Sequence, residues 1–324
     1  MPSLGEQSTG ALLRRSTRPR SAWSELALTQ HWTNILSPTM RGMLLMVFST
    51  ICFTTMQGLI RVVASGADAL HPIEIAFFRN VFGVVALTPV FLRLGLRVLH
   101  TQRLSLHVTR AMIQSAGMVS FFVALTMIPI SEVTALSFSA PLFATVLAVI
   151  VFRERIRLRR ISALLIGFVG VLIILRPGES VMSAGAILVI CSSLGWAIAM
   201  LVIKTLTKTD SPVTMTAYAA LLMSPVTLVP ALFFWTWPTL PQFGLLLCIG
   251  IVGTLGHVSF ASAFREAELS AILPLDFLRL IWASLFGYFV FAESPSVFTW
   301  TGGLMIFASA TYIAIREARL SRTP

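Results

Sequence analysis

Long apolar segments separated by short polar gaps dominate the chain. A helix needs roughly 17–25 mostly apolar residues to cross the hydrocarbon core of a bilayer. Ten segments meet this length, and the gaps between them carry proline, glycine and serine residues that favour turns. The pattern therefore predicts an all-α integral membrane protein with ten transmembrane helices. The predicted spans are residues 42–63, 72–92, 108–128, 131–152, 160–176, 184–206, 212–236, 242–263, 270–291 and 297–316.

The composition agrees with this prediction. Hydrophobic residues make up 56% of the chain and charged residues 11%, and the mean hydropathy is +0.86. A soluble domain carries about 25% charged residues, so this chain lacks the polar side chains to cover a water-facing surface. Its three cysteines lie far apart in apolar runs, a pattern that supports neither a disulfide framework nor a metal site. We expect no metal and no cofactor.

The basic residues sort to one side of the membrane. With the N-terminus in the cytoplasm, 20 of the 24 lysines and arginines fall in cytoplasmic segments, and only Arg61 and Arg176 fall on the opposite side. This asymmetry predicts that both termini are cytoplasmic, by the positive-inside rule. It also explains the net charge of +11 without a nucleic-acid partner. The arginines assigned to the cytoplasmic loop between the second and third spans are Arg93, Arg97, Arg103 and Arg110.

The two halves of the chain resemble each other. Each half contains five spans, an odd number, so the second half must enter the membrane in the opposite sense. We predict two inverted five-helix repeats, residues 41–177 and 183–316, with cytoplasmic tails at 1–40 and 317–324. Inverted repeats are typical of secondary transporters, which bind substrate near the midplane between the repeats. An offset of 139 residues pairs Gly117 with Gly256, Phe121 with Phe260, Ser131 with Ser270, and Glu154 with Glu293, two glutamates expected to cap helix ends.

Four segments carry a resemblance to a known family. The segments HPIEIAFFRN, SEVTALSFSAPLFATVLAVIVFRE, GFVGVLIILRPG and SAILPLDFLRLIWASLFGYFVFAESP resemble the EamA-type branch of the drug/metabolite transporter superfamily. The resemblance covers about residues 41–316, and the first two segments look most like the bacterial S-adenosylmethionine uptake transporters.

The resemblance implies ten helices around a central substrate cavity and transport driven by an ion or by exchange. It implies a multi-pass protein of the bacterial inner membrane, a monomer or a homodimer, whose partners are the lipid bilayer and a small-molecule substrate. The expected activity is uptake of a small polar or amphipathic metabolite resembling S-adenosylmethionine. Export of amino acids, vitamins or drugs is the alternative that the same fold allows.

Ionisable side chains at membrane depth are costly and are functional candidates for that reason. Arg79 lies about 10 Å into the second span. We predict that it faces the cavity and binds an anionic part of the substrate, with a purely structural role as the alternative. Asp276 and Arg279 are three residues apart and share a helical face, where they either act on the substrate or neutralise each other. Pro274 is expected to kink the ninth span just before them.

Polar and aromatic residues within the spans complete the predicted substrate-binding set. Each can contact a ligand, or alternatively bridge and pack between helices, which is the common role of such side chains in membranes. The aromatic members can also stack on a planar or cationic ligand. These residues are Gln57, Gln114 and His257, with Trp196, Tyr218 and Trp282.

Motifs for other functions are absent from the sequence. It contains no HExxH zinc motif and no GxSxG nucleophile turn, and only one aspartate, Asp276, lies at membrane depth. We therefore expect no catalytic residues and no enzyme. No phosphate-binding GxxxxGK[ST] loop is present, so ATP hydrolysis by this chain cannot drive transport. A membrane sensor or interaction protein that shares the transporter fold remains an alternative.

Overall fold

The computed structural model describes residues 36–95, 99–152, 158–176, 183–206, 209–210, 212–267 and 269–320. The N-terminal tail up to residue 35, Glu154 and the last four residues lie outside these ranges. The expectations that concern them remain predictions.

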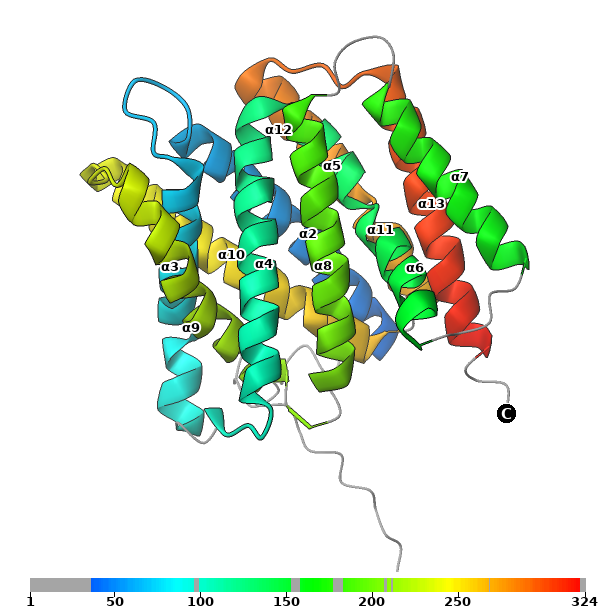
Figure 1. The fold of residues 1–324 in the computed structure, drawn as a ribbon, viewed down its shortest axis with the longest axis horizontal. Coiled ribbons are helices and arrows are strands. Elements are labelled where there is room, and N and C mark those ends of the chain that lie inside the picture. Colours follow the sequence, from blue (N-terminus) through cyan, green and yellow to red (C-terminus); the bar gives the residue numbers. More distant parts are fainter. Residues whose placement is uncertain are drawn as a thin grey trace, which may run out of the picture. The chain divides into compact units, whose positions relative to one another are not determined.

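Ten helical segments form the bundle (Figure 1). Eight are long and apolar enough to cross a membrane, and α7 and α12 are shorter apolar helices, which confirms the predicted number of spans within the described residues. The first repeat comprises α2 (Pro38–Val63), α3 (Pro72–Leu94), α4 (Leu104–Met127), α5 (Ile130–Ser137) with α6 (Ala140–Phe152), and α7 (Leu158–Leu175). The second comprises α8 (Ala184–Leu206), α9 (Pro212–Ala231), α10 (Leu240–Glu266), α11 (Leu269–Asp276) with α12 (Leu278–Phe291), and α13 (Val297–Leu320).

Several boundaries differ from prediction. The first and third spans begin four residues earlier, at Pro38 and Leu104, and α10 extends to Glu266. The seventh span was predicted to continue to residue 236, but α9 ends at Ala231 and a 3₁₀ turn, η2 (Leu232–Phe234), follows it. Pro230 lies inside the last turn of α9 and lacks the N–H that would bond to the preceding turn, which weakens the helix there. The last helix, in contrast, runs beyond residue 316 to Leu320.

The fourth and ninth spans are each broken into two helices. The first break falls at Phe138–Ser139, and the second falls at Phe277, which is 139 residues after Phe138. Proline accounts for the first, because Pro141 removes a helical N–H and crowds the preceding turn, where the break lies. Pro274 precedes the second break, so the same effect falls at the start of α11 and does not explain the interruption at Phe277. The break at matching positions confirms the internal repeat, and the predicted kink after Pro274 is a complete interruption. The two break residues stack on each other, with ring centroids 6.1 Å apart.

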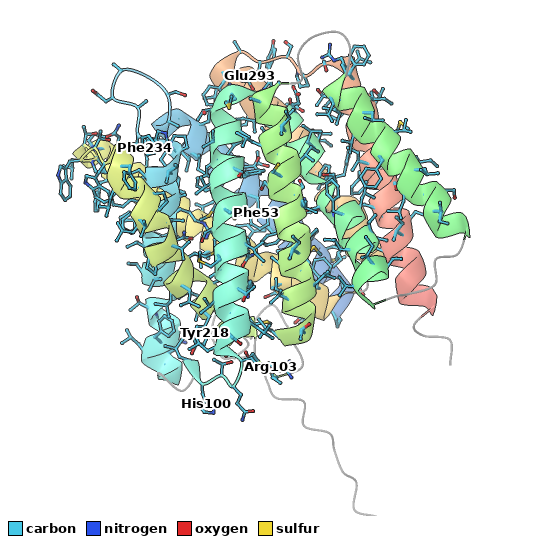
Figure 2. The ribbon with its side chains drawn as sticks, viewed as in Figure 1. Phe53, His100, Arg103, Tyr218, Phe234 and Glu293 are labelled. Atoms are coloured by element: carbon cyan, nitrogen blue, oxygen red, sulfur yellow. The ribbon has the colours of Figure 1, made fainter. Side chains whose placement is uncertain are left out.

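The two repeats interlock, since the most extensive helix contacts all join one repeat to the other. The four largest are those of α2 with α10, α4 with α8, α7 with α13, and α3 with α9. Figure 1 shows two of these pairs side by side, α4 with α8 and α7 with α13. The interior of the protein is therefore the interface between the repeats. Glu293 and Arg103, predicted on opposite sides of the membrane, lie at opposite ends of the bundle (Figure 2).

Glycines allow the closest of these contacts. A Cβ on Gly302 of α13 would lie 2.5 Å from the carbonyl oxygen of Gly170 of α7, and a Cβ on Gly170 would lie 2.7 Å from the carbonyl oxygen of Gly302. Such distances are too short for any real side chain, so the two backbones touch only because both residues are glycine. This is the small-residue packing by which helices associate in membranes.

We expect Gly302→Ala to lower the stability of the protein by about 1–3 kcal/mol, because the added methyl group forces α7 and α13 apart. Gly244→Ala on α10 is the matched control, since a Cβ there meets nothing within 4 Å. Thermal unfolding of the detergent-solubilised protein, followed by circular dichroism, measures both. Equal melting temperatures for Gly302→Ala and Gly244→Ala would contradict this account of the interface.

Candidate functional site

His257 on α10 lies where helices of both repeats meet. Its ring lies edge-on to Phe53 of α2, with centroids 4.9 Å apart, and 6.4 Å from the ring of Trp196 on α8. Phe53 is located midway between the labelled residues of the two ends of the bundle (Figure 2). Three guanidinium groups act electrostatically on the imidazole, and they belong to Arg79 of α3, Arg110 of α4 and Arg279 of α12.

Arg79 has few partners in the protein. Its Nη1 donates to Oδ1 of Asn80 at 3.1 Å, and Asn80 Nδ2 donates to Oγ1 of Thr227 on α9 at 3.3 Å. Gly253 of α10 faces the guanidinium, because a Cβ there would lie 3.5 Å from Arg79 Nε. No residue that the structure describes forms an ion pair with Arg79. Among the described residues, none of its other nitrogens has a hydrogen-bond acceptor.

Arg110 belongs to the same region, although the sequence analysis assigned it to a cytoplasmic loop. That assignment was wrong, because α4 begins at Leu104 and buries Arg110 in its second turn, 8% exposed. Its Nε donates to Oε1 of Gln114 at 2.8 Å, and its Nη1 donates to the carbonyl oxygen of Met215 on α9 at 3.1 Å. A signal was available in the sequence, since position 110 falls inside the predicted span 108–128. Gln114, a predicted site residue, therefore holds Arg110 in place.

Asp276 and Arg279 form an ion pair across the break of the ninth span, with 2.6 Å between Oδ2 and Nη2. The guanidinium also lies over the ring of Phe138, 5.0 Å from its centroid. Asp276 Oδ1 and Arg279 Nε are buried without a hydrogen-bond partner, so the pair satisfies only part of its own bonding capacity. At the matching positions the first repeat has Ser137 and Ala140, which are uncharged, so the pair is a feature of the second repeat.

Two other predicted residues make different contacts. Gln57 of α2 is 4% exposed, and its Oε1 accepts a hydrogen bond from Thr134 Oγ1 of α5 at 3.0 Å, so it bridges two helices. Tyr218 lies toward the predicted cytoplasmic end of the bundle (Figure 2), where its hydroxyl donates to the carbonyl oxygen of Leu99 at 2.7 Å. The structure does not bring either residue into contact with His257.

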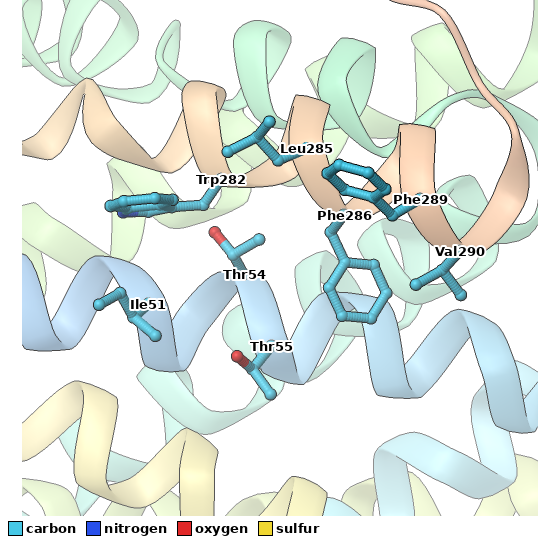
Figure 3. A pocket seen from close by; sticks show the side chains of 8 residues that line it. All are labelled: Ile51, Thr54, Thr55, Trp282, Leu285, Phe286, Phe289 and Val290. Atoms are coloured by element: carbon cyan, nitrogen blue, oxygen red, sulfur yellow. The ribbon is translucent and has the colours of Figure 1, made fainter.

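Trp282 lines an apolar groove between α2 and α12 (Figure 3). Its Nε1 donates to Thr50 Oγ1 of α2 at 3.2 Å. The groove has a volume of about 350 Å³ and opens toward lipid, since Phe289 on its rim is 77% exposed in a membrane helix. Thr54 also lines the groove, and its buried hydroxyl has no hydrogen-bond partner.

A polar network ties the loops at the predicted cytoplasmic end. His107 Nε2 and Thr101 Oγ1 both bond to Oδ2 of Asp210, at 2.7 and 2.8 Å, and the ring of Tyr218 stacks on His107 with centroids 4.5 Å apart. Burial raises the pKa of Asp210, but the hydrogen bonds from His107 and Thr101 together outweigh it and hold the pKa below its usual range. The network joins the segment before α4 to the turn between α8 and α9.

A second network ties the opposite end. Glu293 forms an ion pair with Arg61 and accepts a hydrogen bond from the backbone N–H of Ile130, the first residue of α5, at 3.2 Å. Arg61 Nη1 also donates to the carbonyl oxygen of Ile128 at 2.9 Å. Glu293 thus caps the N-terminus of α5, where a negative charge is favourable, as the sequence analysis predicted.

The arrangement offers hydrogen-bond donors and positive charge. Within the described residues, no three histidine, cysteine, aspartate or glutamate side chains gather closely enough to hold a metal ion. The three cysteines are free thiols.

Comparison with known proteins agrees with this architecture. The model of the EamA-like transporter family matches residues 40–176 and again residues 183–315, which are the two predicted repeats. The chain belongs to the EamA-like transporter family. A solved crystal structure shares the fold, with a TM-score of 0.57 over 85% of this chain and 99% of that chain, at 16% sequence identity.

Relatives in this family carry the names of different transporters. The S-adenosylmethionine uptake transporter of Rickettsia bellii is 30% identical over 77% of this chain and 86% of its own length. The riboflavin transporter of Brucella anthropi is 30% identical over 80% of this chain and 94% of its own length. The pseudopaline exporter of Pseudomonas aeruginosa is 26% identical over 82% of this chain and 93% of its own length. The chain is therefore a membrane transporter and not an enzyme, and its relatives leave the substrate open.

We expect Asp210→Asn to lower the melting temperature at neutral pH, because the variant loses the charged acceptor for His107 and Thr101. A carboxyl group with a lowered pKa stabilises the folded state above its unfolded pKa, about 4, and this stabilisation is lost as the pH falls through the lowered value. The difference in melting temperature between the parent protein and Asp210→Asn should therefore disappear below about pH 4. Melting curves from pH 7 to pH 3 measure it. Asp68→Asn, in an exposed loop, is the control. A difference in melting temperature that grows in acid would contradict the lowered pKa of Asp210.

Proposed function

We propose that this chain is a secondary active transporter that takes up a small polar or amphipathic metabolite across the bacterial inner membrane. One observation carries the proposal: Arg79 of the first repeat lies beside Gly253 of α10, and one turn further along α10 the ring of His257 lies near Phe53 and Trp196, which come from both repeats. Charged groups at membrane depth mark substrate pathways, and inverted-repeat transporters bind their substrate at this location. Compounds resembling S-adenosylmethionine are the first candidates by likeness to the Rickettsia protein.

The two end networks support a cycle of alternating access. The Arg61–Glu293 contacts close one end of the bundle, and the His107–Asp210 contacts close the other. Opening either end breaks hydrogen bonds there while the other end stays tied. The interrupted helices supply the flexible points, since α5 and α11 can tilt relative to α6 and α12 at Phe138 and Phe277.

Uptake into proteoliposomes tests this function. Purified protein in vesicles preloaded with S-adenosylmethionine should exchange it for external labelled S-adenosylmethionine, with saturation, and protein-free vesicles should not. Riboflavin is the second probe, because a family member carries that name. An exporter of amino acids, vitamins or drugs would show flux with those compounds instead. Binding without flux for every compound would favour the alternative of a membrane sensor or interaction protein.

We further propose that Asp276 and Arg279 couple substrate binding to the movement of the ninth span. For an inert pair, changing both residues together restores activity, because each single change leaves an unpaired buried charge. For a coupling pair, Asp276→Asn with Arg279→Gln should transport as poorly as either single variant, with uptake at least about tenfold below that of the parent. The Arg41–Glu266 pair, 2.8 Å long, provides the control, since its double variant should transport normally. Full activity of the Asp276–Arg279 double variant would remove the proposed role.

Both termini are proposed to be cytoplasmic, which can be tested by labelling single cysteines. In a variant that lacks Cys52, Cys191 and Cys248, Ser294→Cys should react with a membrane-impermeant maleimide in intact cells. Gln102→Cys should react only after the membrane is opened. Both positions are exposed in the structure, so access depends on their side of the membrane. Labelling of both from the same side would rule out this topology.

A further inference from the structure

We infer that the substrate is an organic oxyanion, a compound whose carboxylate or phosphate group is bound by Arg79 with Arg110 nearby. This inference rests on the proposed function and specifies the substrate class of the same site. Among the described residues, the three guanidinium groups that act on His257 have one carboxylate partner, Asp276, and that partner is bonded to Arg279. The site without substrate therefore carries an excess of positive charge.

Arg79 is the residue best placed to receive the oxyanion. Among the described residues, Arg79 makes one hydrogen bond, to the neutral amide oxygen of Asn80, and its other nitrogens have no acceptor. A guanidinium group at membrane depth is costly when nothing neutralises it. An oxyanion offers two oxygen atoms whose spacing matches two guanidinium N–H groups, so binding would satisfy both the charge and the free donors.

The surrounding residues fix the orientation of the Arg79 side chain and do not neutralise its charge. Asn80, which accepts from Arg79, is itself bonded to Thr227, and the Thr227 hydroxyl donates to the carbonyl oxygen of Met223 at 2.8 Å. Gly253 of α10 lies beside the guanidinium and brings no charge to it. Every member of this chain of contacts is uncharged, so it fixes the orientation of Arg79 and leaves its positive charge uncompensated.

Arg110 adds a second positive charge, where α4 of the first repeat contacts α9 of the second. It is bonded to Gln114 and to the carbonyl oxygen of Met215, both neutral, and it is buried. Its field reaches His257, as does that of Arg79. Trp196, 6.4 Å from His257 and 39% exposed, offers an aromatic surface for the remainder of the substrate.

Stability without any ligand tests the inference first. If Arg79 awaits an oxyanion, Arg79→Gln removes an uncompensated charge, and the melting temperature should stay the same or rise. Arg61→Gln is the matched control, because Arg61 is paired with Glu293 and its loss leaves that carboxylate alone. The control should melt at a lower temperature. If Arg79→Gln is destabilised as much as Arg61→Gln, Arg79 is a structural residue and the inference fails.

Paired probes then identify the acidic group. S-adenosylhomocysteine and 5′-methylthioadenosine share a nucleoside, and only the first carries a carboxylate. Riboflavin 5′-phosphate and riboflavin differ by a phosphate. Binding is measured as the shift of the melting temperature with probe concentration, which requires no transport. In the arm that matches the substrate, the member that carries the carboxylate or phosphate group should bind about tenfold or more tightly than the member without it.

The same measurement on variants assigns this preference to Arg79. Arg79→Gln should abolish the preference, and Arg79→Lys should retain part of it. Neutral probes that bind the parent as tightly as acidic ones, or a preference that survives in Arg79→Gln, would overturn the inference. If none of the four probes binds, the comparison of Arg79→Gln with Arg61→Gln decides alone. If acidic probes bind more tightly but no compound crosses the vesicle membrane, the proposed transport fails and the inference about the bound group stands. If neutral compounds are transported and Arg79→Gln does not change their flux, the proposed transport stands and the inference fails.

Discussion

The fold depends on packing between the two repeats. Lipid gives helices no hydrophobic reason to associate, so they are held together by close backbone approach and by hydrogen bonds. Here the extensive contacts join α2 to α10, α4 to α8 and α7 to α13, across the repeats in each case. The interior of the bundle is therefore shared between the repeats, and several of its buried polar contacts, such as those of Arg110 with Met215 and of Asn80 with Thr227, join one repeat to the other. The binding region is a direct result of how the bundle is assembled.

The charges of that region are stabilised unequally. Near the ends of the bundle, Glu293 and Asp210 are paired with basic or hydroxyl groups and hold loops together. In the interior, Arg79 and Arg110 contact neutral oxygens only, among the residues that the structure describes. The protein thus keeps its well-satisfied ion pairs at the ends and its unsatisfied charge in the centre, which is the distribution expected of a binding site rather than of a structural network.

The sequence was sufficient to predict the architecture because long apolar runs, an odd number of spans per half and the distribution of arginines are global properties. The breaks at Phe138 and Phe277 were harder to place, since Pro141 follows the first by three residues, whereas Pro274 precedes the second and does not mark its position. For the site, the sequence identified which side chains were costly to bury. It could not show which of them meet: Arg79 and His257 converge, whereas Tyr218 binds Leu99 near one end.

Arg110 shows the limit of counting charges by loop. An arginine near a helix end satisfies the positive-inside rule equally well in water or in the second turn of the helix. The predicted span 108–128 already included position 110, and the hydrogen bonds to Gln114 and Met215 place the side chain in the bundle. Arg110 was therefore predicted on the side of the membrane that the positive-inside rule favours, but in a loop instead of in the bundle.

Asp276 and Arg279 have no charged counterparts in the first repeat, where Ser137 and Ala140 occupy the matching positions. If the two repeats were identical, the state open to one side would be the image of the state open to the other, and the two would have equal energy. A charged pair in one repeat alone removes that equality, because its surroundings change when the ninth span moves and no equivalent change occurs in the fourth. In the proposed cycle of alternating access, the empty protein would therefore rest more often in one of its two orientations, and a substrate arriving from one side of the membrane would find the site open more often than a substrate arriving from the other.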